Sequence, residues 1–452
     1  MAWSEEFVRR ALGTSEPAMD PPAAFPSIST DTRTLAPGAL FVALEGPRFD
    51  GHDHLETARD RGATAAVVRT GTPPVPGLTL VEVDDPLHAL GELARYHRQS
   101  ITGPVVAVTG SNGKTSTKEM IAAVLRTRYA THQTPANLNN LIGIPLTILG
   151  APADTEALVI EAGASVPGEV GRYREIIEPT VAVITNVGAA HLEGFGSLEG
   201  VFREKLALAE NVPLVVVGRE PPDLSSRATE VAHRVLSAGL EDGDVHPTAV
   251  QYDAAGRATV QVDHLRFRLP VSGRHLAANA MLAWAMVREL DLDPLAAAGA
   301  LEDIRLPSGR GDVFREAGLT IIDDCYNANP ESFQAAIGLA GSIQRNGRLV
   351  WVVGTMRELG AEAPAYHAAV ARELVESGPD LIGAVGDFVA AFEPWADRLG
   401  DRLVTAGDVA TLGQTLAPML EPDDTVVLKA SRGVALEGIL PYLRNRDSFT
   451  DG

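Results

Sequence analysis

The stretch VVAVTGSNGKTST, residues 105–117, joins an apolar run to a glycine-rich turn that carries Lys114, Thr115 and Ser116. This order predicts a strand, a turn and the start of a helix. Backbone N–H groups of such a turn and the positive end of the helix attract phosphate oxygens, a lysine adds charge, and a threonine hydroxyl can ligate Mg²⁺. The stretch therefore predicts a nucleotide site within an α/β fold.

The turn is shorter than the usual phosphate loop, because Val108 occupies the position of the expected first glycine. The motif is G-x-x-G-K-T, formed by Gly110, Ser111, Asn112, Gly113, Lys114 and Thr115. A glycine-containing turn with an incidental lysine is the alternative interpretation. The apolar run before the turn and the apolar positions 120, 121, 124 and 125 after it favour nucleotide binding.

Length and composition limit the class of protein. A chain of 452 residues is too long for one ordinary domain, and we expect three, over residues 1–101, 102–307 and 308–452. The apolar runs are too short to span a membrane and the first residues lack a secretory signal, so we expect a soluble cytoplasmic protein. A net charge of −21 argues against nucleic-acid binding. The single cysteine, Cys325, excludes an intrachain disulfide.

Strand-like and helix-like segments alternate in each predicted domain. The first is a small α/β domain, with strands near 40–44 and 65–68 and helices near 54–61 and 86–100. The second has a parallel sheet, an antiparallel hairpin within 248–270 and a helix over 275–289; its sheet strands are predicted at 105–109, 157–163, 181–187 and 214–218. The third is again α/β and doubly wound, with strands at 319–323, 349–354, 381–385 and 425–429.

Polar residues follow the predicted central strands, where open parallel sheets bind ligands. Glu161 ends one strand, Asn186 and His191 follow the next, and Lys205 lies on the helix after it. A carboxylate and an imidazole could ligate a divalent metal that bridges a nucleotide's phosphates. Alternatively, Glu161 is a helix N-terminal charge and His191 a hydrogen-bonded loop residue, and Lys205 alone is typical of a solvated helix surface.

Two segments near the start of the third domain carry further candidate groups. DDCYNANP, residues 323–330, follows a strand, so that Asp324 could accept hydrogen bonds from a ribose and Tyr326 could stack on a base. A polar turn with capping carboxylates is the alternative. SGRG, residues 308–311, places Arg310 where it could reach a phosphate across a cleft, although a flexible linker has the same composition.

The first domain holds two polar motifs, SISTDTR at 27–33 and RFDGHDH at 48–54. Their Asp31, Arg33, Asp50 and His52 suit a diphosphate sugar or a uracil edge. They suit an ordinary surface loop equally well, and composition does not decide between the two.

Taken together, these motifs resemble the Mur ligases of peptidoglycan synthesis over nearly the whole chain. STDTR, DGH, VTGSNGKTST, NLNNLIGIP at 137–145, ITNVGAAHLEGFGS, GRG, DDCYNANP and KASR at 429–432 occur in the family's order. The resemblance implies the three-domain Mur ligase architecture: a small N-terminal α/β domain, a central parallel-sheet P-loop ATPase domain and a C-terminal Rossmann-like domain. DDCYNANP and NLNNLIGIP are most similar to the branch that adds D-alanyl-D-alanine to UDP-N-acetylmuramoyl-tripeptide.

The resemblance implies an ATP-dependent ligase that works through an acyl phosphate. We expect the chain to be a monomer. Lys114 would contact the β- and γ-phosphates, Thr115 and Glu161 would hold one Mg²⁺, and His191 would hold a second, oriented by a carbamylated Lys205. ATP would also be bound by Asn279, Arg310, Asp324 and Tyr326. The uridine nucleotide would lie on Ser29, Asp31 and Arg33, and the muramoyl peptide would pass Asn137, Asn139 and Asn140.

Four positions depart from the family's pattern, namely Leu276, Thr355, Ala430 and Leu436. A sister ligase that adds a single amino acid, or glutamate to folate, is one alternative function. A nucleotide-gated binding or motor protein is another, although it would leave Glu161, His191 and Lys205 without a purpose.

Overall fold

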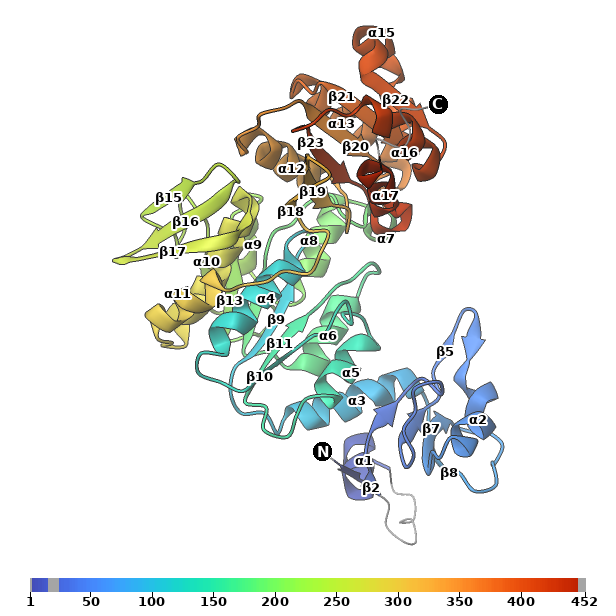
Figure 1. Cartoon of the computed structure of the whole chain (residues 1–452). Helices are drawn as coiled ribbons and strands as arrows, with labels where there is room; N and C mark the ends of the chain where they lie inside the picture. Colours follow the sequence, from blue (N-terminus) through green and yellow to red (C-terminus); the bar gives the residue numbers. More distant parts are fainter. Residues whose placement is uncertain (1, 15–23, 446–452) are drawn as a thin grey trace.

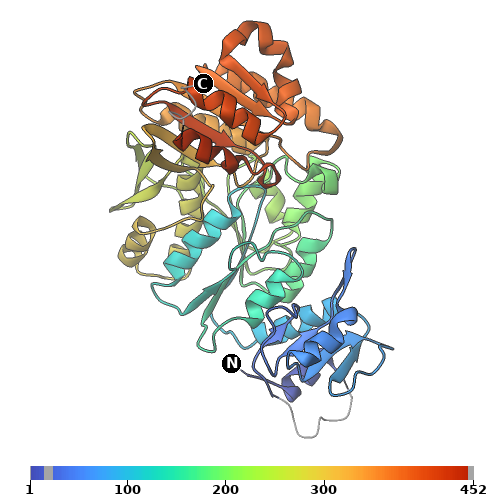
Figure 2. The ribbon, with the colours of Figure 1, turned by 45° about the vertical axis from the view of Figure 1, so that its right-hand side comes forward.

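The computed structural model of the chain describes residues 2–14 and 24–445. They form three α/β units that follow one another along the molecule (Figure 1). The turned view in Figure 2 shows the same arrangement, with the N-terminal unit at one end, the central unit in the middle and the C-terminal unit at the other end. No helix in this part of the chain combines the length and the apolar character that a membrane span needs.

The central unit is built on a sheet of six parallel strands in the order β10-β11-β9-β12-β13-β14. The strands are β9 (Val105–Thr109), β10 (Thr131–Gln133), β11 (Ala157–Glu161), β12 (Val181–Ile184), β13 (Leu214–Val217) and β14 (Val235–Ser237). Four of them confirm the predicted apolar runs, whereas the short edge strands β10 and β14 were not predicted. Every residue of β9 and β11 is buried, as expected of strands covered on both faces.

Alternate side chains of β9 enter two different cores, as the two-residue period of a strand requires. Val105 and Ala107 pack with α3, α5 and α6, while Val106 and Val108 pack with α4, α10 and α11. The helices are α3 (Pro86–Arg98), α4 (Lys114–Leu125), α5 (Gly143–Leu149), α6 (Glu169–Ile177), α7 (Leu192–Phe195), α8 (Leu198–Leu206), α9 (Leu224–Thr229), α10 (Arg274–Glu289) and α11 (Pro294–Glu302).

The predicted hairpin within 248–270 is part of a three-stranded antiparallel sheet. Its strands are β15 (Ala249–Tyr252), β16 (Arg257–Val262) and β17 (Leu265–Ser272). The tight turn between β16 and β17 was missed because the strands alternate polar and apolar residues on both sides of it.

The N-terminal unit has four parallel strands in the order β3-β4-β7-β8. They are β3 (Ile28–Ser29), β4 (Leu40–Val42), β7 (Ala65–Arg69) and β8 (Thr79–Val83), with α2 (Leu55–Asp60) on one face and α3 on the other. A hairpin of β5 (Glu45–Gly46) and β6 (Phe49–Asp50) projects from the unit and rises beside the central unit, along the length of the molecule (Figure 1). Helix α3 also packs on α5 and α6, so it joins the two units.

The C-terminal unit has six strands in the order β18-β19-β23-β20-β21-β22, all parallel except the β18–β19 pair. The strands are β18 (Asp312–Glu316), β19 (Leu319–Asp324), β20 (Leu349–Val353), β21 (Leu381–Val385), β22 (Leu403–Ala406) and β23 (Thr425–Lys429). The helices are α12 (Pro330–Ser342), α13 (Ala363–Glu376), α14 (Asp387–Phe392), α15 (Ala396–Leu399), α16 (Val409–Leu416) and α17 (Leu440–Arg444). The four predicted strands are confirmed, and the edge strands β18 and β22 were not predicted.

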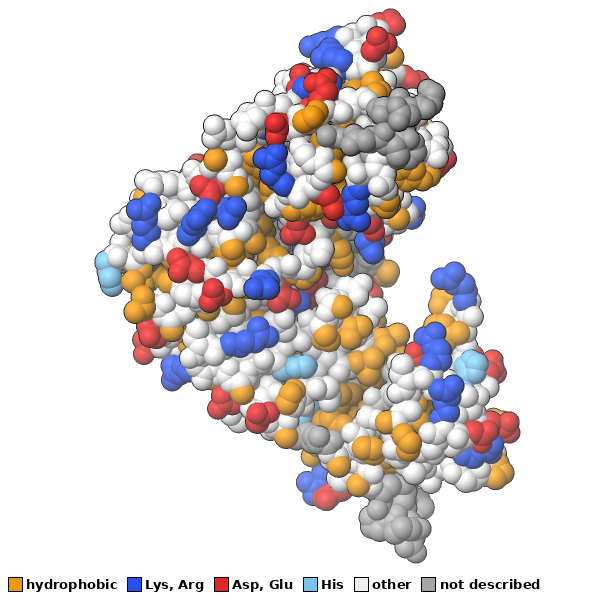
Figure 3. All heavy atoms as spheres, in the orientation of Figure 1, with side chains coloured by type: hydrophobic (Ala, Val, Ile, Leu, Met, Phe, Trp, Pro, Cys, Tyr) orange, Lys and Arg blue, Asp and Glu red, His pale blue; other side chains and the backbone are white. Residues whose placement is uncertain are grey.

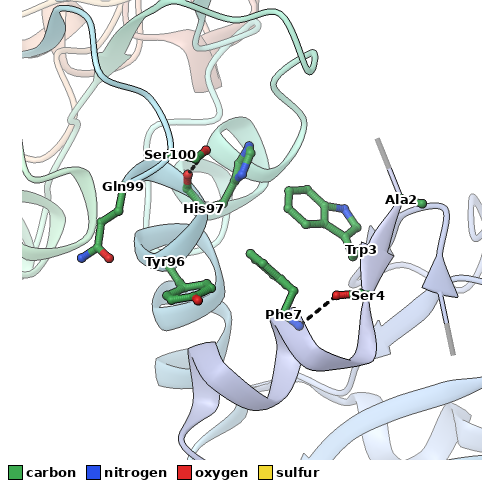
Figure 4. A pocket seen from close by; sticks show the side chains of 8 residues that line it. All are labelled: Ala2, Trp3, Ser4, Phe7, Tyr96, His97, Gln99 and Ser100. Atoms are coloured by element: carbon green, nitrogen blue, oxygen red, sulfur yellow. Dashed lines mark hydrogen bonds between the residues drawn. The ribbon is translucent and has the colours of Figure 1, made fainter. Parts of the chain in front are cut away.

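The first helix, α1 (Glu5–Leu12), follows β1 (Trp3–Ser4), which pairs with β2 (Ala24–Phe25). An aromatic cluster fastens α1 to α3, and its side chains line an open pocket remote from the phosphate turn (Figure 4). Trp3 meets the edge of His97 at 4.6 Å between ring centroids, and Phe7 lies 5.4 Å from Tyr96. Burial lowers the pKa of His97 to about 4, and its Nε2 has no hydrogen-bond partner among the described residues.

The depressed pKa of His97 predicts a pH-dependent stability. Between pH 6.5 and 4 the His97 imidazole of the unfolded chain binds a proton that the buried imidazole of the folded chain does not bind. The free energy of unfolding therefore decreases as pH falls through that window. At pH 5 the loss should be about 1 kcal/mol after allowance for solvent screening. His97→Phe should therefore flatten the fall in thermal stability between pH 7 and pH 5, and His88→Phe, at an exposed site on the same helix, should not. Equal slopes in all three proteins would contradict the assignment.

Candidate active site

The turn after β9, the phosphate turn (residues 110–113), has two glycines that no other residue could replace without strain. Gly110 has φ +146°, and a Cβ there would lie 1.9 Å from Thr185 Oγ1. Gly113 has φ +77°, and a Cβ there would lie 2.8 Å from Asn279 Nδ2. The glycines thus let Asn279, on α10, approach the turn.

Helix α4 begins directly after this turn, and no side chain caps its N-terminus. Thr115 and Ser116 are buried in its first turn. Lys114 Nζ donates to the carbonyls of Gly110 at 2.8 Å and Ser111 at 3.2 Å, so the lysine folds back over the turn. Burial lowers the pKa of Lys114. Backbone N–H groups, a helix N-terminus and a lysine therefore converge as an anion site requires.

Glu161, at the end of β11, is held beside the turn by a buried network. Its backbone N–H donates to Thr134 Oγ1 at 2.9 Å, and Asn139 Nδ2 donates to its Oε1 at 2.9 Å. Thr134 is fixed in turn by Lys118, whose Nζ donates to the Thr134 carbonyl at 2.9 Å. The other carboxylate oxygen, Oε2, is buried without a partner in the described part of the chain. A buried anionic oxygen of this kind needs a cation or a donor.

His191 follows β12 and has a left-handed backbone, with φ +55°. Its Nδ1 pairs with Oε2 of Glu358 in the C-terminal unit, and Ser165 Oγ lies 3.4 Å from the same nitrogen. The bond with His191 lowers the pKa of the Glu358 carboxyl. A carboxylate on Nδ1 fixes the ring and leaves Nε2 as the nitrogen that could face a metal.

Lys205 on α8 is completely buried, so the interpretation of this residue as a solvated surface cation is wrong. Its Nζ has no hydrogen-bond partner among the described residues and lies 5.5 Å from the centroid of the Phe195 ring. Burial, and then the charge of Lys114, lower its pKa to about 7. The neighbouring Glu204 does not neutralise it directly, because its carboxylate accepts the N–H groups of Gly168 and Val170.

The C-terminal unit brings Asp324 and Arg310 to the same region. Asp324 ends β19 and accepts from Lys429 Nζ at 2.5 Å, and Lys429, which is fully buried, also donates to the Asn327 carbonyl. The Arg310 guanidinium lies 3.8 Å above the centroid of the Tyr326 ring. One face of that ring is therefore covered by Arg310.

Residues of the turn after β9 and of the C-terminal unit line one cavity between the two units, whereas Lys114, Glu161, His191 and Lys205 are not among its lining residues. A space of about 150 Å³ is lined by residues of both units, including Asn112, Gly113, Ser116, Asn279, Arg310, Asp324, Tyr326 and Lys429. A second cavity of about 770 Å³, lined by Asn186, Arg219, Tyr252, His275, Asn279 and Glu331 among others, adjoins it through shared residues. The geometry can therefore hold an elongated phosphorylated ligand with its phosphates on the turn.

The donors beside the turn suit a magnesium ion better than a metal ion that takes all of its ligands from protein side chains. No three His, Cys, Asp or Glu side chains converge anywhere within residues 2–14 and 24–445. Mg²⁺ usually takes one or two protein oxygens together with waters and phosphates. The orphan Oε2 of Glu161 and the buried hydroxyl of Thr115 are donors of that kind.

The candidate residues of the N-terminal unit bond mainly to one another. Arg33 pairs with Asp31 at 2.7 Å and lowers the pKa of that carboxyl to about 2, and Ser29 Oγ accepts from the Asp31 N–H. Asp50 accepts from His52 Nδ1 at 2.6 Å, while His52 Nε2 accepts from the N–H of Arg69. His52 therefore ties the β5–β6 hairpin to β7, and the exposed Arg33 is the group best placed to meet a ligand.

The three candidate asparagines after β10 have different surroundings. Asn139 contacts Glu161, as described above. Asn140 Oδ1 accepts from the N–H groups of Ile142 and Gly143, so its side chain organises the start of α5. Asn137 is exposed beside them.

The four departures from the family's pattern have structural contacts, and one of them, Leu276, also lines the cavity of about 150 Å³. Leu276, Ala430 and Leu436 are buried in the apolar cores of their units. Thr355 Oγ1 accepts from the N–H of Asp387, where α14 begins, at 3.0 Å.

Three residues at the site escaped the sequence analysis. Lys429 was seen only as part of KASR, although a lysine that ends an apolar strand is itself a signal of a ligand edge. Thr134 and Glu358 carried no such signal, because they act through contacts with Glu161 and His191 that are distant in sequence.

Comparison with known proteins gives a consistent match along the chain. Residues 25–98 match the Mur ligase family catalytic domain, residues 108–287 the Mur ligase middle domain, and residues 309–432 the Mur ligase glutamate ligase domain. The UDP-N-acetylmuramoyl-tripeptide–D-alanyl-D-alanine ligase of Bacillus subtilis (strain 168) is 35% identical over 430 residues, which cover 92% of each chain.

Solved structures agree with this match. A crystal structure of MurF from Acinetobacter baumannii has a TM-score of 0.88 at 30% identity and covers 98% of this chain and 99% of its own. MurF ligase from Thermotoga maritima in complex with ADP has a TM-score of 0.81 at 30% identity and covers 93% of this chain and 97% of its own.

The Asp324–Lys429 pair predicts an asymmetric response to substitution. Asp324→Ala should destabilise the protein by about 3 kcal/mol, because it leaves the buried Lys429 ammonium without its anion. Asp324→Asn should cost less, since an amide oxygen still accepts from Nζ. Urea unfolding of the two variants and the wild type measures the difference. If both variants unfold at the wild-type urea concentration, the pair is unimportant for stability.

Proposed function

Since the chain belongs to the Mur ligase family, we propose that it joins D-alanyl-D-alanine to UDP-N-acetylmuramoyl-tripeptide at the expense of ATP. The observation that carries the proposal is similarity over the full length to ligases of that name, together with a cavity where the phosphate turn meets Arg310 and Asp324. The products would be UDP-N-acetylmuramoyl-pentapeptide, ADP and phosphate.

The reaction needs activation because a carboxylate is a poor electrophile at neutral pH. The terminal carboxylate of the tripeptide attacks the γ-phosphorus of ATP, the bond from that phosphorus to the β,γ-bridging oxygen breaks, and an acyl phosphate and ADP result. The amine of D-alanyl-D-alanine then attacks the acyl carbon, and phosphate leaves as the amine loses a proton. The protein mainly positions the reactants and neutralises developing negative charge.

The described contacts support a role for each part of the cavity. The turn and the N-terminus of α4 suit the β- and γ-phosphates, with Lys114 moving from its carbonyl partners to the phosphates. Arg310 adds a second cation from the C-terminal unit. Asp324, oriented by Lys429, is available to ribose hydroxyls, and Asn279 lines both cavities.

Magnesium would be held by Thr115 and Glu161, and a second ion by His191. When bound, Mg²⁺ would neutralise phosphate charge during transfer. The unpartnered oxygen of Glu161 and the Glu358-fixed ring of His191 support this assignment.

Lys205 suits conversion to a carbamate. An unprotonated amine attacks CO₂, a bond forms between Nζ and carbon, and a proton is released, so the site gains an anion. Its buried Nζ, which has no hydrogen-bond partner in the described part of the chain, supports this role, because a carbamate would place oxygens where the amine bonds to nothing.

The three domains would divide the work. Residues 1–101 would bind the uridine nucleotide through Ser29, Asp31, Arg33, Asp50 and His52; residues 102–307 and 308–452 would enclose ATP. The hollow between the N-terminal and central units, with apolar side chains along its wall (Figure 3), would receive the muramoyl peptide near Asn137, Asn139 and Asn140. Consumption of ATP favours work in the cytoplasm, and we expect a monomer.

Phosphate release tests the function directly. With ATP and UDP-N-acetylmuramoyl-tripeptide, steady release should require D-alanyl-D-alanine, and mass spectrometry should detect the pentapeptide. A sister ligase would accept a single amino acid instead, and a motor protein would release phosphate without any acceptor. Either result would refute the proposal.

The carbamate predicts chemical rescue. Lys205→Ala should lose at least about 100-fold in kcat, the order of loss seen when a group that stabilises developing charge is removed, and added short carboxylates should restore part of it. Carbon-13 bicarbonate should give a carbamate signal by NMR in the wild type and none in the variant. Full activity of Lys205→Ala without additives would exclude the role.

A further inference from the structure

Two side chains at the start of α12, the N-cap Asn329 and Glu331 in the first turn, cross from the C-terminal unit to the central unit. Asn329 Nδ2 donates to Asn112 Oδ1 at 2.9 Å, which connects the start of α12 directly to the phosphate turn. Glu331 Oε1 accepts from the backbone N–H of Ala189 at 2.7 Å, in the loop after β12. Both contacts join residues more than a hundred positions apart in the sequence.

The central side of this junction is rigidly braced. Ser111 Oγ donates to the Gly188 carbonyl at 3.0 Å and accepts from the Gly188 N–H at 2.9 Å. Asn112 is fixed by Asn186, whose Oδ1 accepts from the Asn112 N–H at 2.8 Å. The phosphate turn and the loop after β12 therefore form a single surface, and α12 contacts it at two points.

The α12 side is equally fixed. Asn329 is the N-cap of α12, and its Oδ1 accepts from the Ser332 N–H while Ser332 Oγ accepts from the Asn329 N–H. Lys429 binds both Asp324 and the Asn327 carbonyl, so the loop from 324 to 329 has little freedom. A shift of α12 would thus carry Asp324 with it.

Gly188 provides the space for Glu331. A Cβ at residue 188 would lie 2.6 Å from the Glu331 carboxyl carbon. The backbone of Gly188 is outside the left-handed region, so the fit with Glu331, and not backbone conformation, is what favours glycine here.

We propose that Asn329 and Glu331 are positioning residues that register the C-terminal unit on the phosphate turn, and so set where Asp324 and Arg310 stand relative to Lys114. This proposal rests on the proposed function only in requiring that the cavity binds a nucleotide; it does not require the ligation reaction. Weakening the junction lowers the fraction of molecules that present both halves of the cavity, and the apparent affinity for nucleotide falls by the same fraction.

The junction can be weakened by two variants that preserve the fold. Glu331→Ala removes the acceptor for the Ala189 N–H, which is destabilising, and it also removes the buried Oε2 that has no partner among the described residues, which is stabilising. The two effects oppose each other, so the thermal midpoint should change little. Asn329→Ser keeps an N-capping oxygen but is too short to reach Asn112. Glu331→Gln keeps an acceptor oxygen and should restore most of the behaviour. Glu393→Ala, at an exposed position of the same unit, is the control.

Two readouts separate positioning from folding. Labels at Glu230→Cys and Glu376→Cys, on the central and C-terminal units, report the distance between the units without nucleotide, and the native Cys325 is buried. In Glu331→Ala and Asn329→Ser the distribution of this distance should broaden. The dissociation constant of a non-hydrolysable ATP analogue should rise about ten-fold, which is the effect of losing one good hydrogen bond. In the ligation assay KM for ATP should rise while kcat at saturating ATP stays within about two-fold.

A double-mutant cycle tests the fit at Gly188. Gly188→Ala should open the junction, and Gly188→Ala with Glu331→Ala should be no worse than Glu331→Ala alone, because the added methyl then meets no carboxylate. The proposal would be overturned if the effects of Gly188→Ala and Glu331→Ala were additive in the double variant. It would also be overturned if each single variant kept the wild-type distance between the labels and the wild-type affinity for the analogue. Because analogue binding and label distance need no ligation, failure of the proposed ligase activity would be seen separately.

Discussion

The site depends on one constraint, which is that the carboxyl edges of two parallel sheets face each other across a shared cavity. The turn after β9 and the loop after β12 line the cavity from the central sheet, and Glu161 lies beside that turn at the end of β11. Asp324 and Lys429, at the ends of adjacent strands, line it from the C-terminal sheet. Parallel strands present loops and helix N-termini at that edge. An anionic ligand in the cavity can therefore meet backbone N–H groups and charges from both edges.

Three buried lysines differ in how the fold compensates the cost of burying their charge. Lys429 is paired with a carboxylate, Lys118 donates to a backbone carbonyl and to Glu119, and Lys205 has no hydrogen-bond partner among the described residues. Burial of a cation costs free energy unless it is compensated. The first two are compensated within the fold and stabilise it, whereas the third is compensated only if its chemistry changes, which is why Lys205 is the reactive one in the proposed mechanism.

The local sequence pattern predicted those strands that are buried on both faces of a sheet. Continuous apolar runs such as residues 105–109 and 349–353 are strands covered on both faces, and they were found. The edge strand β18 was missed because its side chains are only half-buried and its pattern is weak. Site residues at strand ends, such as Glu161 and Asp324, carried a positional signal, whereas Thr134 and Glu358 act only through partners that folding brings to them.

By itself the sequence determined the α/β class, the phosphate turn and the order of motifs along three units, because apolar periodicity and glycine placement are local properties of the chain. Tertiary structure alone decided that Lys205 is buried, that Tyr326 carries Arg310 on its face, and that Glu331 meets Ala189 through the space left by Gly188. The first two facts depend on side-chain packing within a unit, and the third depends on how two units pack against each other. Contacts between residues more than a hundred positions apart have no period or spacing that a local pattern could record.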